Sequence, residues 1–296
     1  MRMSGGRRPA IASYNLRGIA AMTAASLLFA GNDACLKLVS KALPATELVA
    51  IRNTLAACLL VIYGLATGEM LPWRARMERA IFWRTFGEIG IIIFYLFALF
   101  RIPIGLAASI LQFGPLAMTA GAAIFLKESV GWRRWTATAV GLVGVLLMIG
   151  PGTQGLSPAA WMAVVALLFM TLRELATRGV PRDVPATQIA LVSVVAVAAI
   201  ALALTPVEGY VTPAGWHLFY LSISAACVVM AFLLIIYAMR TGEVGVVAPF
   251  RYSYAVGSLL LGYFIWSETP TPIAFAGLVI VVASGLYVLH REQARR

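Results

Sequence analysis

The sequence predicts an all-α integral membrane protein with ten transmembrane helices, arranged as two inverted five-helix repeats. Three observations support this prediction: the composition, the spacing of long apolar segments, and the recurrence of short patterns in both halves. Of the 296 residues, 61% are hydrophobic and only 12% are charged. Soluble domains carry about a quarter charged residues, so lipid must solvate much of this chain.

Ten segments are long and apolar enough to cross a bilayer, which takes roughly 17–25 helical residues. Turn-forming pairs such as Leu43-Pro44, Pro151-Gly152 and Thr205-Pro206 separate them. The predicted spans are 18–38, 46–66, 83–100, 104–126, 133–150, 157–178, 186–205, 215–239, 244–266 and 271–290.

Lysine and arginine are distributed unequally between the segments that join these spans. With a cytoplasmic N-terminus, 17 of the 23 basic residues, Arg84 included, fall on the cytoplasmic side. Only Lys37, Lys41 and Arg101 fall in external loops. This asymmetry predicts that both termini are cytoplasmic. It also accounts for the net charge of +11 without nucleic acid, which we do not expect as a partner.

The two halves share short patterns at a shift of 140 or 141 residues. Leu-Leu-Phe at 27–29 recurs at 167–169, Pro-Ala-Thr at 44–46 recurs at 185–187, and Glu128 matches Glu268. Five spans per half is an odd number, so the halves must have opposite orientations, a recurring design of secondary transporters. The expected organisation is a cytoplasmic tail at 1–17, repeats at 18–150 and 157–290, and a second tail at 291–296.

Ionisable side chains are costly inside a membrane, and each is a functional candidate. Six lie away from the loops: Asp33, Arg52, Glu88, Arg173, Glu174 and Arg251. Helix rise places Asp33 and Arg52 at a similar depth in the external half, where they can pair, and the other four in the cytoplasmic half. Two roles are open for these tiers: gates that close a central path, or fixed pairs that hold the bundle together.

Spans four and nine each contain a proline, Pro115 and Pro249, which kinks a helix and frees a backbone carbonyl. Exposed backbone is tolerated in a membrane where it lines a cavity or is buried by neighbours. Gln112 of span four aligns with Tyr252 of span nine, so both repeats have a polar side chain at this place. We expect these spans to line a substrate path; the alternative is a kink that serves packing alone.

No enzymatic chemistry is predicted. Cys35, Cys58 and Cys227 are far apart and lack metal-ligand spacing, and no phosphate-binding GxxxxGK[ST] loop is present. We expect no catalytic residues, no metal and no cofactor. A membrane-embedded enzyme, the rival class, would need a nucleophile or metal constellation that we do not find.

With these features established, the chain resembles the drug/metabolite transporter superfamily, and within it the EamA-type ten-helix transporters. The resemblance covers about residues 18–290. It rests on the matching halves, on the segment 27–53, on Glu128 with GWRRW at 131–135, and on GLVG at 141–144. Within the family, the chain is most similar to the YddG-like amino-acid exporters.

The resemblance implies alternating access through a central cavity and export of small metabolites, most specifically neutral and aromatic amino acids. The alternative is another solute, such as a drug, a nucleoside-type metabolite or a sugar. From chemistry alone, we expect Arg251 to bind a carboxylate. We expect Tyr95, Phe113 and Tyr252 to contact a side chain, with Gln112 beside them.

The expected setting is the inner membrane of a bacterium, with lipid and a small-molecule substrate as partners. Proton coupling through Asp33, Glu88 or Glu174 and simple facilitated diffusion are both open, because an arginine neighbour offsets the effect of burial on a carboxyl group. The sequence does not indicate an oligomeric state.

Overall fold

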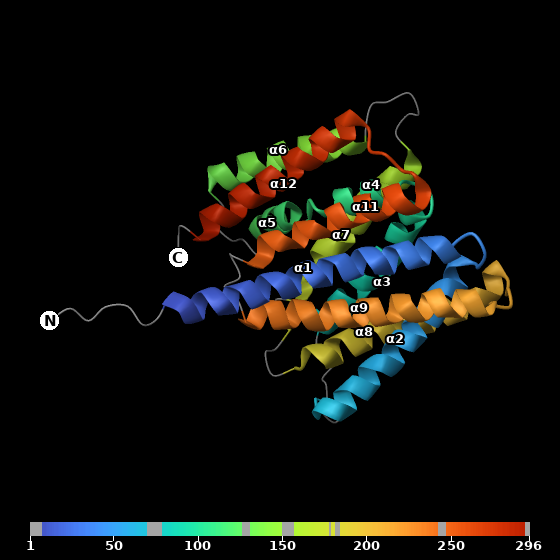
Figure 1. Cartoon of the computed structure of the whole chain (residues 1–296). Coiled ribbons are helices and arrows are strands. Elements are labelled where there is room, and N and C mark those ends of the chain that lie inside the picture. Colours follow the sequence, from blue (N-terminus) through green and yellow to red (C-terminus); the bar gives the residue numbers. More distant parts are fainter. Residues whose placement is uncertain are drawn as a thin grey trace.

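The computed structural model describes residues 8–69, 79–125, 131–149, 157–177, 179–180, 184–241 and 247–293, and within these ranges it contains helices but no strand (Figure 1). The helices of the first half are α1 (Arg8–Val39), α2 (Ala45–Thr67), α3 (Arg79–Leu99), α4 (Ile104–Leu111), α5 (Gly114–Phe125) and α6 (Trp132–Ile149). Those of the second half are α7 (Pro158–Thr177), α8 (Ala186–Glu208), α9 (Gly215–Thr241), the 3₁₀ helix η1 (Ala248–Tyr252), α11 (Ser253–Trp266) and α12 (Pro272–Gln293).

The long helices pack mainly on helices from the other half of the chain. α1 packs on α9 and α3 on α7, while α2 packs on α8, α4 on α11, and α6 on α12. Exchanging the two halves converts the α1–α9 contact into the α7–α3 contact and returns the α2–α8 and α6–α12 pairs to themselves. The α6–α12 pair lies along one side of the bundle and the α2–α8 pair along the opposite side (Figure 1).

Seven helical segments of the described chain are long and apolar enough to cross a membrane. They lie in α1, α2, α3, the combined α4–α5 segment, α7, α8 and α9. The apolar parts of α6 and α12 are shorter, at 135–148 and 272–287. The chain is thus a multi-pass helical protein by length and composition.

Several helices extend beyond the predicted spans, α1 and α8 among them. α1 begins at Arg8, ten residues before the predicted start at residue 18. α8 continues through Pro206 to Glu208, where a turn was expected. Thr205 Oγ1 donates to the Ala201 carbonyl at 2.8 Å within this last turn, and Gly209 ends the helix with a φ of 94°. Proline near a helix end interrupts little of the hydrogen-bond ladder, so the prediction of a turn at 205–206 was wrong.

Both proline-containing spans are interrupted where the sequence predicted. α4 ends at Leu111, and the Gln112 and Phe113 amides bond to carbonyls three residues back before α5 begins at Gly114. On the other side of the bundle, η1 contains Pro249 and gives way to α11 at Ser253. The two interruptions lie close together, because Gln112 Nε2 donates to the Arg251 carbonyl at 3.3 Å.

Glycines allow two of the helix pairs to approach closely. A Cβ added at Gly144 of α6 would lie 2.8 Å from the carbonyl oxygen of Gly277 on α12. A Cβ at Gly87 of α3 would lie 3.0 Å from the backbone nitrogen of Arg173 on α7. The second crossing matters for the site below, because it sets the separation of charged side chains on α3 and α7.

Candidate functional site

The first polar cluster of the bundle interior surrounds the Asp33 carboxylate on α1. Tyr95 Oη of α3 donates to Asp33 Oδ2 at 2.7 Å, and Tyr254 Oη of α11 donates to the same oxygen. Asn32 Nδ2 donates to Asp33 Oδ1 at 2.9 Å, and Asn32 Oδ1 accepts a bond from Ser224 Oγ of α9 at 2.7 Å. We call these five residues the hydroxyl cluster; it joins four helices drawn from both halves.

The hydroxyl cluster has a place for one additional proton. Tyr95 Oη and Tyr254 Oη lie 2.5 Å apart, so three contacts join these two oxygens and Asp33 Oδ2. Each tyrosine hydroxyl has one proton to donate. Two protons therefore serve three contacts while Asp33 is ionised, and a proton on Asp33 would occupy the third.

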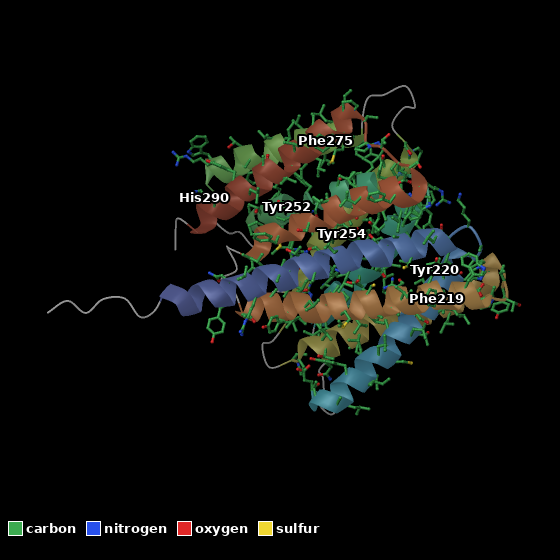
Figure 2. All side chains as sticks on the ribbon, in the orientation of Figure 1. Phe219, Tyr220, Tyr252, Tyr254, Phe275 and His290 are labelled. Atoms are coloured by element: carbon green, nitrogen blue, oxygen red, sulfur yellow. The ribbon has the colours of Figure 1, made fainter. Side chains whose placement is uncertain are left out.

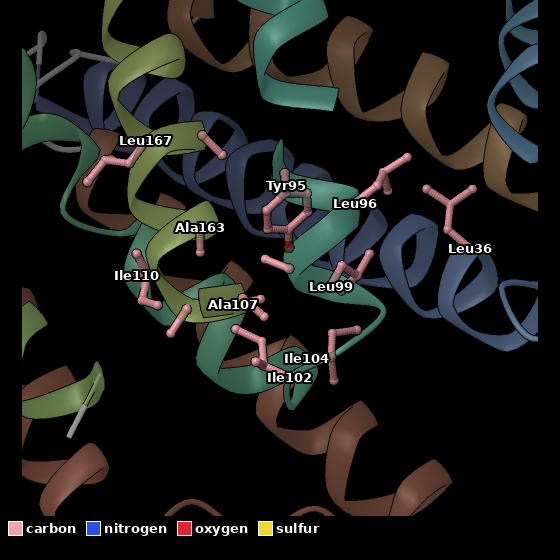
Figure 3. Close-up of a cluster of buried hydrophobic side chains, with 14 of the residues drawn as sticks. Leu36, Tyr95, Leu96, Leu99, Ile102, Ile104, Ala107, Ile110, Ala163 and Leu167 are labelled. Atoms are coloured by element: carbon pink, nitrogen blue, oxygen red, sulfur yellow. The ribbon is translucent and has the colours of Figure 1, made fainter. Parts of the chain in front are cut away.

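The surroundings of the hydroxyl cluster are apolar. Tyr95 and Asp33 are both buried, and Tyr95 belongs to the main hydrophobic core of the bundle. Figure 3 shows Tyr95 beside Leu96 and Leu99, with side chains of neighbouring helices around it. Hydrogen bonds in such surroundings are stronger than in water, and unpaired polar groups cost correspondingly more.

Arg52 of α2 does not form the predicted ion pair with Asp33. No carboxylate of the described chain lies within 4.0 Å of its guanidinium, and none of its nitrogens has a hydrogen-bond partner there. Its electrostatic neighbours are Glu88 and Asp33. The carboxylate of Asp33 is instead satisfied by hydroxyl and amide donors, which explains why the expected pairing did not form.

The second polar cluster is a set of ion pairs between α3 and α7. Arg173 Nη1 contacts Glu88 Oε2 at 3.0 Å, and Arg173 Nη2 contacts Glu174 Oε1 at 2.7 Å. We call these three residues the ion-pair cluster. The close approach of the helices at Gly87 brings Arg173 onto Glu88, the neighbour of that glycine.

Arg52 links the two clusters electrostatically, because it interacts with both Asp33 and Glu88. Arg84, which we expected at the membrane edge, is buried inside α3, where it donates to Ser193 Oγ of α8. Because α3 begins at Arg79, Arg84 lies about one and a half turns inside the helix rather than at its end.

The predicted substrate residues fall into two groups. Tyr95 belongs to the hydroxyl cluster, and Gln112 and Arg251 meet at the helix interruptions, where the exposed Arg251 side chain interacts electrostatically with Glu174.

Phe113 packs toward Gly141 of α6, and the Tyr252 ring packs against Gly285 of α12. Tyr252 and Tyr254 stand on either side of the junction between η1 and α11 (Figure 2).

A third cluster closes the loops at one end of the bundle. Lys37 Nζ of α1 contacts Glu268 Oε1 at 2.7 Å and donates to the Ile102 carbonyl at 2.8 Å. Glu268 Oε2 accepts a bond from the Ile104 amide at 2.8 Å, at the start of α4. From the sequence, Glu268 was identified only as the repeat match of Glu128. Its position just after the last apolar residue of α11 could have indicated that it links helices.

Four polar residues of these clusters were not among the sequence candidates: Asn32, Ser224, Tyr254 and Ser193. Tyr254 could have been found by its spacing, because it follows Tyr252 by two residues and points to a different face of the helix. Asn32 adjoins Asp33. Neither serine had a signal, since small hydroxyl residues are common in transmembrane helices.

Known proteins share this architecture. The EamA-like transporter family model matches residues 16–150 and again residues 157–289. The chain belongs to the EamA-like transporter family. The two matched ranges together cover most of the chain, and each contains one of the two interrupted spans.

Several curated relatives have transport names. The S-adenosylmethionine uptake transporter of Rickettsia felis is 26% identical over 189 residues, which is 63% of each chain. The riboflavin transporter of Vibrio cholerae is 25% identical over 288 residues, covering 95% of this chain and 96% of that one. The pseudopaline exporter of Pseudomonas aeruginosa is 23% identical over 276 residues, covering 90% and 94%. The chain thus spans less than two thirds of the rickettsial relatives.

A solved crystal structure shares the fold. It superposes with a TM-score of 0.68 at 22% identity, over 97% of this chain and 99% of that chain. At this identity the likeness shows the architecture alone. The relatives named above do not include a YddG-like amino-acid exporter, so the substrate is a separate question.

Proposed function

We propose that this protein is a secondary transporter that exports small metabolites, most specifically neutral and aromatic amino acids, by alternating access through a central path. The observation that carries the proposal is that two charged side chains, Asp33 and Arg52, lie inside a bundle of the EamA family without forming an ion pair with each other. Transporter substrates bind near the middle of such bundles, between the two repeats.

Ten spans in two inverted repeats, with both termini in the cytoplasm, remain our proposal for the topology. The exchange of the α1–α9 and α7–α3 contacts supports two related halves, and an odd number of spans per half would give them opposite orientations. α1 begins and α12 ends at the same end of the bundle, as an even number of crossings requires (Figure 1). The excess of basic residues in one set of loops supports our proposal that this end faces the cytoplasm, with the protein in the bacterial inner membrane.

The substrate class is proposed from the site and from one relative. S-adenosylmethionine carries an α-amino-acid group, and its uptake is the named activity of the rickettsial relatives. A riboflavin-type solute is the second candidate, because the relative so named matches nearly the whole chain. Riboflavin has no ammonium or carboxylate group, so charged side chains in the path would have no partner on it.

The proposed lining comprises Tyr95, Gln112 and Arg251, with Asp33 and Arg52 beside Tyr95. Phe113 and Tyr252 pack against the outer α6 and α12 helices, which favours a packing role for both. Glu88, Arg173 and Glu174 are proposed to close one end of the path. The broken helices at Pro115 and Pro249 provide polar backbone along it.

We assign proton coupling to Asp33. Glu88 and Glu174 both contact Arg173, whereas Asp33 has only neutral donors within hydrogen-bond distance. The unfilled contact among Tyr95, Tyr254 and Asp33 provides a place for the transported proton.

The test is uptake of radiolabelled solutes into liposomes that contain the purified protein. The panel holds neutral and aromatic amino acids, S-adenosylmethionine and riboflavin, each with and without an imposed pH gradient. Saturable amino-acid flux that the gradient accelerates is expected for wild type, and flux at the level of empty liposomes for Asp33→Asn. Flux of riboflavin without amino-acid flux would reject the amino-acid proposal and retain transport. Empty liposomes provide the background.

A further inference from the structure

The most unusual charged group in the bundle is Arg52. Its side chain is 6% exposed, yet its guanidinium forms neither an ion pair nor a hydrogen bond within the described chain, and its Nε is wholly buried without a partner. A guanidinium has five N–H donors and is always charged. Buried charges are normally paired, because an unpaired one costs several kcal/mol. A side chain retained in this state indicates a partner that the protein itself does not supply.

The surroundings of Arg52 attract its charge but leave its donors free. Asp33 and Glu88 both interact with it electrostatically from beyond contact distance. Glu88 is engaged by Arg173, and Asp33 by three neutral donors. Neither acid can move onto Arg52 without giving up those bonds. The guanidinium is therefore held available for a planar anion such as a carboxylate.

Asp33 has capacity for one more donor. Its Oδ2 accepts from two tyrosine hydroxyls, but its Oδ1 accepts only from Asn32. A carboxylate oxygen accepts about two hydrogen bonds, so one position on Oδ1 is free. An ammonium group would fill it and would place a positive charge beside a carboxylate that has no ion-pair partner among the described residues.

We propose that Arg52 and Asp33 together bind the zwitterionic head of an α-amino acid, Arg52 taking the carboxylate and Asp33 taking the ammonium group. This site deepens the proposed transport function and rests on it. Arg52 and Asp33 sum to zero charge, so a zwitterion leaves the interior neutral, whereas a lone cation or anion would not. Both side chains are buried, so the helices must separate to admit the substrate, as alternating access requires.

The first experiment needs no variant. Isothermal titration calorimetry on the purified wild-type protein compares L-phenylalanine with 2-phenylethylamine, which lacks the carboxylate, and with 3-phenylpropionate, which lacks the ammonium group. Each analogue leaves one buried charge without its partner, so we expect each to bind at least ~10-fold more weakly than L-phenylalanine. An analogue that binds as tightly as L-phenylalanine, or absence of L-phenylalanine binding, overturns the proposal.

The second experiment assigns each end of the zwitterion to its residue. Arg52→Gln should weaken L-phenylalanine binding at least ~10-fold and bind 2-phenylethylamine at least as tightly as wild type does, because the positive charge that opposes a lone cation is gone. Asp33→Asn should weaken L-phenylalanine similarly and bind 3-phenylpropionate at least as tightly as wild type does. Arg101→Gln is the matched control: it removes an exposed arginine whose guanidinium bonds to the Phe97 carbonyl and lies over the Phe97 ring, and all three affinities should stay at wild type.

Failure of the proposed site and failure of the proposed transport function would give different results. An equal loss of all three ligands in Arg52→Gln, as a structural defect would produce, contradicts the assignment. Saturable L-phenylalanine uptake by wild type without discrimination among the analogues rejects this site and retains the transport function. Absence of both L-phenylalanine uptake and binding, in folded protein, rejects the amino-acid function together with the site.

Discussion

The hydroxyl cluster and the ion-pair cluster hold equivalent places in the two halves of the chain, yet they satisfy their charges in opposite ways. Asp33 and Arg173 align at a shift of 140 residues. Asp33 is an acid held by neutral hydroxyl and amide donors, whereas Arg173 is a base held by two carboxylates. The same position in the fold is thus used for two different kinds of chemistry.

The two clusters differ in whether they can accept a proton or an ammonium group. A carboxylate held by hydroxyls keeps its charge and can accept a proton or an ammonium group without separating an ion pair. The ion-pair cluster has no such freedom, because removing either partner leaves a charge in a low-dielectric interior. We therefore assign substrate binding to the hydroxyl cluster with Arg52, and stability to the ion-pair cluster.

The largest expected effect is on the ion-pair cluster. Arg173→Gln leaves Glu88 and Glu174 without their common partner and should lower the free energy of unfolding by about 3–5 kcal/mol. Unfolding in detergent, followed by circular dichroism, measures it. Arg101→Gln, which removes an exposed arginine, should stay close to wild type. Equal stabilities of the two variants would show that the Arg173 pairs contribute nothing to the fold.

Arg52→Met is expected to act in the opposite direction. It replaces an unpaired buried charge with an apolar side chain of similar length, and comparable replacements of buried charges are neutral or stabilising by about 1–4 kcal/mol. Stability should rise while L-phenylalanine binding is lost, a trade typical of binding residues. A marked fall in stability in the same unfolding assay would mean that Arg52 is held by the protein rather than reserved for a ligand.

The smallest expected effect separates two neighbouring tyrosines. Tyr254→Phe removes one donor to Asp33 and should cost about 1–3 kcal/mol of stability, because hydrogen bonds to charged groups are the stronger ones. Tyr252→Phe removes a buried hydroxyl that has no hydrogen-bond partner in the described chain, and stability should be unchanged or slightly higher. Matched thermal unfolding curves for the pair give the difference, and an equal cost in both would contradict the described hydrogen bonding.

The sequence predicted much of the architecture because its signals are additive over many residues. Hydropathy over each span, the basic loops and the repeat patterns all indicated a helical membrane protein with related halves. Pro115 and Pro249 both lie next to helix interruptions, and the loss of an amide donor acts locally whatever the neighbours are. The end of α8 was missed because a proline in a last turn costs little.

The candidate site was predicted less well because it depends on helix rotation. Depth along a helix placed Asp33 near Arg52, but which face each side chain occupies is set by packing between helices. Tyr254 and not Tyr252 reaches Asp33, because residues two positions apart point to different faces of the helix. The contacts of Arg173 with Glu88 and Glu174 depend in the same way on the close crossing at Gly87.

The most direct test of the division between the clusters is uptake of labelled L-phenylalanine into liposomes that contain wild type, Asp33→Asn or Arg101→Gln at matched amounts of folded protein. We predict saturable uptake by wild type and Arg101→Gln, and uptake by Asp33→Asn reduced to the level of empty liposomes. Wild-type uptake rates in Asp33→Asn would contradict the account, because the hydroxyl cluster would then have no part in transport.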